Sequence, residues 1–188
     1  MLPIRRAAVT LRAVELGRRG NGALAGAVAA AVWAVQQPVD KRIFRCPHDD
    51  VALLGKAITR GPAWPAAGVL LHLQSGAVLG AVYAEVRPSL PGPPVARGVA
   101  AALLEHLGLW PLVRVSDRAH PARDEISPLS GNRRAFMQAT WRHLLFGAVL
   151  GELEARLNGE AWGKPRPVPV SSDGHGDIET AVGATAPT

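Results

Sequence analysis

The sequence is poor in the residues and motifs that usually mark an enzyme or a secreted domain. Its 188 residues include one cysteine, Cys46, which excludes an intramolecular disulfide. It contains no glycine-rich phosphate-binding loop, no nucleophile elbow and no HExxH metal motif. Lysine is rare, so arginine supplies most of the positive charge. These absences favour a non-enzymatic protein and leave enzymatic activity open.

Charge is also missing from two long stretches of the chain. Residues 20–39 contain no charged side chain, and residues 61–84 contain none if His72 is neutral. A helix rises about 1.5 Å per residue, so about 20 such residues span a bilayer core of roughly 30 Å. The mean hydropathy is only +0.11, because the apolar residues are concentrated between charged loops. A soluble bundle with alanine-rich core helices is the alternative.

Two further apolar segments contain ionisable side chains. Glu105 and His106 lie in the third segment, and Arg142 and His143 lie in the fourth. A charge inside a membrane is costly unless it is paired or hydrated, so we expect Glu105 to pair with Arg142. The sequence thus predicts an all-α integral membrane four-helix bundle within a domain at residues 20–157. The expected helices cover about residues 22–38, 66–86, 96–115 and 135–157.

The flanking segments are polar. Residues 1–19 combine five arginines with apolar residues, which is typical of a cationic amphipathic segment at a membrane surface. Residues 158–188 are rich in Pro, Gly, Ser and Thr and are expected to be disordered. The net charge is +6, and because the arginines lie between uncharged runs, we expect lipid headgroups as the partner rather than nucleic acid.

An internal repeat links the two halves of the chain. The string HLQSGAVLG begins at His72 and HLLFGAVLG begins at His143. In each half a tryptophan precedes an aspartate by seven residues, as Trp33 precedes Asp40 and Trp110 precedes Asp117. We interpret this order as two pseudo-repeated helix hairpins inserted in the same direction. The charged loops would then lie on one side of the membrane, with both termini and the Pro/Gly-rich turn after Glu85 on the other.

Glycine pairs four residues apart occur in three of the expected helices. Such spacing makes a flat helix face on which another backbone can approach closely. The pairs predict tight helix packing, either within the bundle or between copies in a homo-oligomer. The packing residues are Gly22 and Gly26, Gly76 and Gly80, and Gly147 and Gly151.

Polar side chains are expected to converge in the half of the membrane nearer the charged loops. The predicted buried polar cluster consists of His72, Glu105, His106, Arg142 and His143. Ionisable groups in a membrane are functional candidates, and a neutral imidazole both donates and accepts a proton. The cluster is open to three interpretations: proton or small-solute handling, haem b or metal binding through His72 and His143, or interhelical hydrogen bonds in a membrane scaffold or assembly partner.

The loop sequence RCPHDD, residues 45–50, contains candidate metal ligands in Cys46, His48, Asp49 and Asp50. A second cluster at zinc-like spacing is lacking, so we expect a solvated loop there. A short helix is expected to follow, from about Asp49 to Thr59, with an aspartate at its start. The sequence alone leaves the metal content of the protein undetermined.

The chain resembles the YagU type of small bacterial inner-membrane proteins, a family of uncharacterised function. The resemblance rests on the arginine cluster before Gly22 and Gly26, the segment from His72 to AEVRP, the opening of the third helix at Gly98, and His143 followed by EARLN. It covers roughly residues 18–158 and implies a bacterial inner membrane. Positive charges are equal in number on the two predicted sides, but the arginines before the first helix favour cytoplasmic termini.

Overall fold

The computed structural model describes residues 2–159, with side chains from Glu15 onward. It is all-α over this range, with no strand, which confirms the predicted fold class at that level. The helices are α1 (Leu2–Phe44), α2 (Asp50–Ile58), α3 (Trp64–Val86), α4 (Pro94–Leu109), α5 (Val113–Ala119) and α6 (Arg133–Asn158), with 3-10 turns η1 (Arg87–Ser89) and η2 (Trp110–Leu112). The predicted disordered tail at 158–188 lies outside the described residues from position 160 onward.

Three helical segments are long and apolar enough to cross a membrane. They are Glu15–Phe44, Trp64–Ser89 and Pro94–Ala119, the last of which joins α4, η2 and α5. Their length and composition indicate a multi-pass membrane protein in contact with the lipid bilayer. The fourth expected span corresponds to α6, which is long but too polar to belong to this set.

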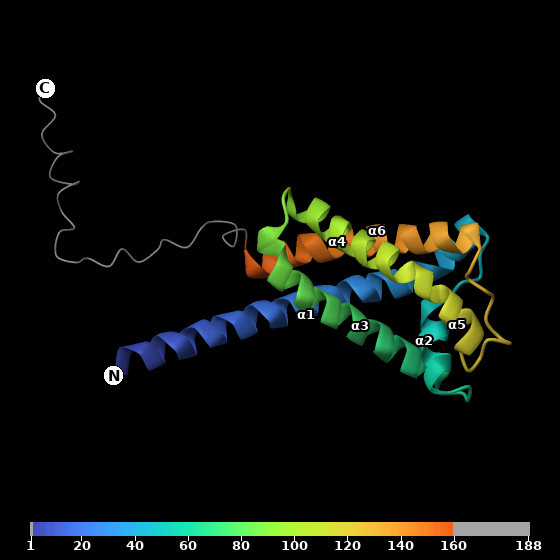
Figure 1. Cartoon of the computed structure of the whole chain (residues 1–188), viewed down its shortest axis with the longest axis horizontal. Coiled ribbons are helices and arrows are strands. Elements are labelled where there is room, and N and C mark those ends of the chain that lie inside the picture. The colour runs from blue at the N-terminus through green and yellow to red at the C-terminus, as the bar shows by residue number, and fades with distance from the viewer. Residues whose placement is uncertain (1, 160–188) are drawn as a thin grey trace, which may run out of the picture.

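The helix α1 is the centre of the arrangement. It packs against α3 on one side and α6 on the other, while α4 packs against α6 and α2 packs against the start of α3. Figure 1 shows α3 and α4 diverging from the turn that joins them. The bundle therefore has an open side between α3 and α4.

Helix α1 is continuous from Leu2 to Phe44, with Pro38 inside it. The segment 1–19 and the span expected at 22–38 thus belong to one helix, which extends beyond the other helices at its N-terminal end (Figure 1). The placement of residues 1–19 at a membrane surface stays a prediction. Arg45 follows the helix with φ 49°, the left-handed conformation common after a helix C-terminus. It turns the chain into α2, where Asp49 accepts a hydrogen bond from the Ala52 amide at 2.9 Å and caps the predicted short helix.

Glycine backbones form the main helix contacts. A Cβ atom added at Gly22 would lie 2.7 Å from the Cβ of Ala84, and one at Gly76 would lie 2.6 Å from that of Ala30. In the second hairpin a Cβ at Gly147 would lie 2.6 Å from the Gly98 carbonyl oxygen. Real Cβ atoms essentially never come this close, so these positions require glycine for the observed helix spacing.

The paired glycine faces are therefore used inside the chain. Gly22 and Gly26 of α1 meet Gly76 and Gly80 of α3, and Gly98 of α4 meets the pair Gly147 and Gly151 of α6. The structure thus places all six glycines where backbones of two helices approach closely. Another helix of the chain already covers each face, so association with a second copy or a scaffold partner stays a prediction that these contacts do not support.

Small residues and a few aromatic rings make up the core between the helices. Ala25, Ala29 and Ala30 of α1 are almost fully buried, and Ala102 of α4 is fully buried. The larger core side chains include Trp33, Tyr83, Phe146 and Leu150. Alanine at these positions allows the backbones to approach, and the tryptophan fills the wider space towards the loop end of the bundle.

The end of the bundle opposite the loops is closed by a buried ion pair. Arg87 Nη1 donates to Glu154 Oε2 at 2.8 Å, and both side chains are almost fully buried. Glu85 of α3 accepts hydrogen bonds from Arg18 and Arg19 of α1. These contacts tie α1, α3 and α6 together and leave the cavity described below at the other end.

Candidate functional site

Arg142 of α6 is fully buried at the loop end of the bundle, where it binds two aspartates. Its Nε and Nη2 atoms donate to the two carboxylate oxygens of Asp40 at 2.6 and 2.7 Å. Its Nη1 atom donates to Asp50, and Nη2 also donates to the His48 carbonyl oxygen at 3.0 Å. A two-pronged guanidinium–carboxylate pair of this kind is among the strongest hydrogen-bonded pairs in proteins. Arg142 thus joins α6 to the end of α1 and the start of α2.

Asp40 and Asp50 each have further donors. Asp40 accepts from Gln36 Nε2 of its own helix and from Gln138 Nε2 of α6, both at 2.6 Å. Asp50 accepts from the indole Nε1 of Trp33 at 3.1 Å and lies 3.2 Å from His48 Nε2. Burial alone would raise the pKa of the Asp50 carboxyl, but His48 and Arg142 hold that pKa below its usual value. Asp50 is therefore an anion at neutral pH.

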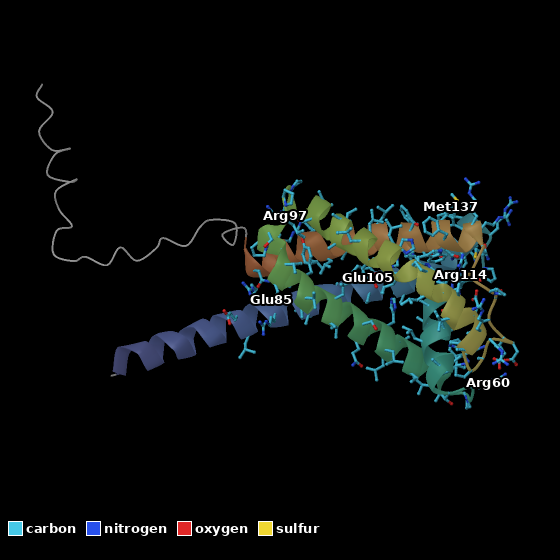
Figure 2. All side chains as sticks on the ribbon, viewed as in Figure 1. Arg60, Glu85, Arg97, Glu105, Arg114 and Met137 are labelled. Carbon is cyan, nitrogen blue, oxygen red and sulfur yellow. The ribbon has the colours of Figure 1, made fainter. Side chains whose placement is uncertain are left out.

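A cavity of about 250 Å³ lies directly beside this network. The side chains of Asp50, His72, Glu105 and His143 give it polar walls, and Trp33 and Phe146 give it aromatic ones. The rings pack edge to face, with Trp33 centred 5.2 Å from His72 and 4.7 Å from His143. Figure 2 places Glu105 between the loop end, labelled at Arg60 and Arg114, and the opposite end, labelled at Glu85 and Arg97.

His143 and Glu105 form the pair with the clearest chemical consequence. The Nδ1 atom of His143 lies 2.7 Å from the Ala139 carbonyl oxygen, which can only accept, so Nδ1 carries a proton. The other ring nitrogen, Nε2, lies 3.0 Å from Glu105 Oε2. A lone pair facing a carboxylate would be repulsive, so this contact requires one proton, on the ring or on the carboxyl. The pair is therefore a binding site for one proton on the cavity wall.

His106 lies directly behind this pair. Its ring centre is 4.4 Å from that of His143. The Thr140 hydroxyl lies 2.8 Å from the Phe136 carbonyl oxygen, to which it donates, so it accepts from His106 Nε2 at 3.0 Å. This bond fixes the His106 tautomer with the proton on Nε2. His106 is 3% exposed and packs between Trp110 and Phe136, which places it in the aromatic layer rather than on the cavity wall.

His72 comes to the cavity from α3 and packs edge to face with Trp33, as His143 does from α6. It is 7% exposed, and its Nε2 atom has no hydrogen-bond partner among the described residues. A buried polar atom without a partner costs free energy, so such an atom on a cavity wall is a candidate for ligand binding. The two histidines of the sequence repeat thus converge on one indole ring.

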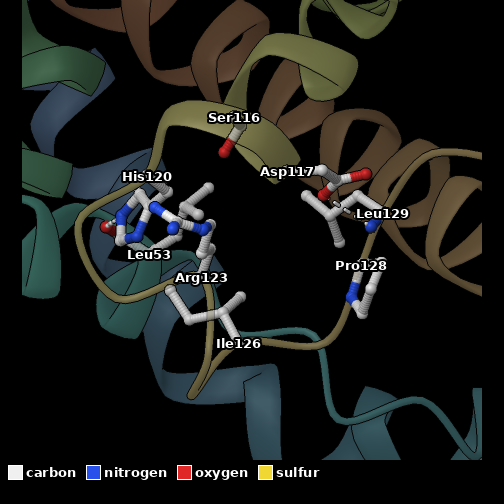
Figure 3. A pocket seen from close by; sticks show the side chains of 8 residues that line it. All are labelled: Leu53, Ser116, Asp117, His120, Arg123, Ile126, Pro128 and Leu129. Carbon is white, nitrogen blue, oxygen red and sulfur yellow. Dashed lines mark hydrogen bonds between the residues drawn. The ribbon is translucent and has the colours of Figure 1, made fainter.

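The helix α2 covers the cavity on the loop side. Leu53 and Leu54 of α2 line the cavity, and the close approach of Gly55 to the α3 backbone holds the helix in place. The Leu53 carbonyl oxygen accepts a hydrogen bond from His120 Nε2 at 2.8 Å, while His120 Nδ1 accepts from the Ala122 amide at 3.1 Å. Figure 3 shows His120 and Leu53 on one wall of a small second pocket and Asp117 on the other.

Ion pairs on the loop surface attach α2 to the loop that follows α5. Lys56 Nζ donates to Glu125 at 2.7 Å, and Arg60 donates to Glu125 Oε1 and, at 2.7 Å, to Asp124. These cations lower the pKa values of both carboxyls, and they do so chiefly through hydrogen bonds from Lys56 to Glu125 and from Arg60 to Asp124. The cover of the cavity is therefore built from both charged loops.

Haem or metal binding through His72 and His143 is not favoured by this geometry. The Trp33 ring lies against both imidazoles, and the two ring nitrogens of His143 already contact Ala139 and Glu105. A macrocycle between the histidines would need this indole to leave. Within residues 2–159 no three His, Cys, Asp or Glu side chains are grouped so that they could hold a metal ion.

The five residues of the predicted cluster lie at one end of the bundle but divide into two groups. His72, Glu105 and His143 line the cavity, His106 lies behind them, and Arg142 belongs to the aspartate network. The expected Glu105–Arg142 pair is wrong, because Glu105 contacts His143 instead.

The expectation of a solvated RCPHDD loop is also wrong for part of that segment. Cys46 is 3% exposed and His48 is 5% exposed. Asp40 and Asp50 were missed as site residues, although the requirement of a partner for Arg142 was the signal that could have found them. Comparison with protein-family models, with curated proteins and with solved structures gave no match to this chain.

Proposed function

We propose that this chain is a non-enzymatic multi-pass membrane protein that binds and passes protons, and can take up a small solute, at the cavity between α1, α3, α4 and α6. The observation that carries the proposal is the contact of His143 Nε2 with Glu105 Oε2 at 3.0 Å, which requires one proton. A carboxylate and an imidazole at this distance can share one proton and pass it on to a group that enters the cavity. Ionisable groups in an apolar helical environment mark ion and solute pathways in membrane proteins.

The surroundings of the pair support exchange rather than a purely structural role. A structural pair is expected to be enclosed, as Arg87 and Glu154 are at the other end of the bundle. By contrast, the side chain of Glu105 is 32% exposed, within a cavity that also holds the unpartnered Nε2 atom of His72. A solute in the cavity can therefore reach the proton-binding atoms.

We also propose a membrane topology in which α6 is a fourth span. The buried pairing of Arg142 with Asp40 and Asp50 supports this span, because pairing reduces the free-energy cost of placing the Arg142 charge in the membrane. Two related hairpins are supported by the similar contacts of Gly76 with Gly26 and of Gly147 with Gly98. The tryptophan and aspartate landmarks do not support them, because Trp33 donates to Asp50 whereas Trp110 packs on Phe136. The proposed location is a bacterial inner membrane with cytoplasmic termini, as for the YagU type.

The proposed function is tested by proton flux into liposomes that contain the purified protein and an internal pH-sensitive dye. With a potassium gradient and valinomycin to set the potential, we expect flux well above that of protein-free liposomes. Glu105→Gln should abolish this flux, because an amide cannot hold the exchangeable proton. Glu152→Gln is the matched control, since Glu152 is an exposed α6 carboxylate paired with Arg156 by i,i+4 spacing.

Folding is checked in the same preparations by helix content and by resistance of the buried Cys46 to maleimide. Flux that persists in folded Glu105→Gln protein would refute the assignment of the proton site. Wild-type flux no greater than that of empty liposomes would refute the proposed function as a whole.

A further inference from the structure

The cavity continues sideways into a groove between α3 and α4. This groove has a volume of about 370 Å³ and shares Ser75, Leu79 and Glu105 with the cavity wall. From this shared region it follows α3 past Val78 to Val82, away from the loops. Figure 1 shows the divergence of α3 and α4 that leaves this side of the bundle open.

The two parts of this space differ in chemistry. The groove is lined by Leu71, Val78, Leu79 and Val82, with Gln74 and Ser75 as further polar groups. Val78 and Val82 are more than half exposed, on a helix that is long and apolar enough to lie in lipid. A molecule with an apolar body can therefore lie along α3 and be reached from the bilayer, with its polar end directed towards Glu105.

The polar end of the space is suited to a cation. Asp50 and Glu105 line the cavity, and neither its wall nor that of the groove includes a lysine or arginine. The rings of Trp33 and Phe146 lie on the same wall, with their centres 6.1 Å apart. Aromatic faces next to carboxylates attract organic cations, and quaternary ammonium ligands are recognised in this way. Two carboxylates thus line the cavity of a chain whose net charge is +6.

The same carboxylate holds the shared proton. A cation bound at Glu105 replaces the positive charge that protonated His143 places beside this carboxylate. A cation and an imidazolium bound there together would repel each other. The ionisable groups that face His143 are Glu105 at 3.0 Å, His106 at a ring distance of 4.4 Å, Asp50 and His72 across the cavity, and Arg142 behind Asp50. Of these, Glu105 alone is both in contact with His143 and exposed to the groove.

We propose that the cavity and groove bind an amphipathic organic monocation, with its charge at Glu105 and its apolar body along α3, in exchange for the His143–Glu105 proton. One cation enters and one proton leaves, so the charge of the site is unchanged. Because binding is reciprocal, the cation weakens proton binding by the same factor as the proton weakens cation binding. This inference rests on the proposed function and names the solute class.

The test uses tetraphenylphosphonium as the probe and the full-length protein in detergent. Titration calorimetry in buffers of different ionisation enthalpy should show release of about one proton per bound cation. Because one proton competes with each cation, affinity should fall as the pH is lowered, by up to about tenfold per pH unit. Tetraphenylborate, which has the same shape and the opposite charge, should not bind.

Two variants separate this inference from the proposed function. Val78→Trp fills the groove at a position outside the cavity wall, so it should weaken tetraphenylphosphonium binding at least tenfold while proton flux in liposomes persists. Glu105→Gln should abolish both, and Glu152→Gln should change neither. Loss of binding counts only for protein that keeps wild-type helix content and Cys46 protection.

Each result decides between the claims. Proton flux without tetraphenylphosphonium binding, or equal binding of tetraphenylborate, overturns the cation inference and leaves the proposed function standing. Absence of both flux and binding overturns both. A co-purified zwitterionic phospholipid that the probe cannot displace would show that a lipid headgroup is the cation of this site, and would overturn the assignment of a free solute.

Discussion

Replacement of Arg142 by methionine should be strongly destabilising. The substitution keeps an unbranched side chain but removes every hydrogen bond that the guanidinium donates to Asp40, Asp50 and the His48 carbonyl. Asp40 is fully buried, so its charge would be left with only the amide donors of Gln36 and Gln138. Removal of one partner of a buried ion pair costs about 3–5 kcal/mol. We expect a loss in this range for Arg142→Met.

The loss can be measured by SDS titration in mixed micelles, followed by helix circular dichroism and by maleimide labelling of Cys46. Arg156→Met on the same helix is the matched control, because Arg156 is exposed and its pairing with Glu152 should contribute less than about 1 kcal/mol. Addition of Asp40→Leu should recover part of the loss from Arg142→Met, because it removes the uncompensated charge. A cost of less than about 1 kcal/mol for Arg142→Met, or a double variant less stable than both singles combined, would refute this account of the network.

Two further predictions concern the glycine contacts and the loop cover. Gly147→Ala should lower the free energy of unfolding by about 1–3 kcal/mol, because its Cβ would meet the Gly98 backbone. Gly17→Ala, with open space around it, should raise the free energy of unfolding slightly. Equal effects of the two substitutions in the same SDS titration would contradict the packing argument. Pairing with Lys56 and Arg60 lowers the pKa of Glu125 in the folded state, so the stabilisation it gives is complete above the unfolded value of 4.5 and is lost as the pH falls through the lower folded value. Spin labels on α2 and on residues 120–126 should therefore separate in acid, and Glu125→Gln should show the same separation at neutral pH.

The sequence predicted those features of the fold that depend on the residue types and spacing within one helix. Glycines four residues apart indicated close helix contacts, and the structure places all three pairs in such contacts. Uncharged length indicated the first two membrane helices, and the segment with Glu105 and His106 is the third. The histidines of the repeat, His72 and His143, were expected inside the bundle, and both lie on the cavity wall. Local spacing is enough for such statements because they depend on one helix at a time.

The pairing of charges depends on the relative position of several helices, which local spacing does not determine. Asp40 lies beyond the first helix expected at residues 22–38, but α1 continues to Phe44 and Asp40 is fully buried against Arg142. Asp50 was expected only in a solvated helix start, whereas its neighbour Asp49 caps α2 and leaves Asp50 free to reach Arg142. Because neither aspartate was considered as a partner for Arg142, Glu105 was expected in that role, whereas it contacts His143.

The division between the two groups of charges explains how one end of the bundle can be both rigid and chemically active. Arg142 pairs with both Asp40 and Asp50 on the side of α1 and α2, and with His48 it holds Asp50 as an anion at neutral pH. Glu105 lies on α4, on the open side, where its contact is a histidine rather than an arginine. An arginine would hold that carboxylate permanently as an anion, whereas an imidazole can give up its proton. The proposed exchange is thus confined to the pair that faces the groove, and the arginine network keeps Trp33 and α2 in place around it.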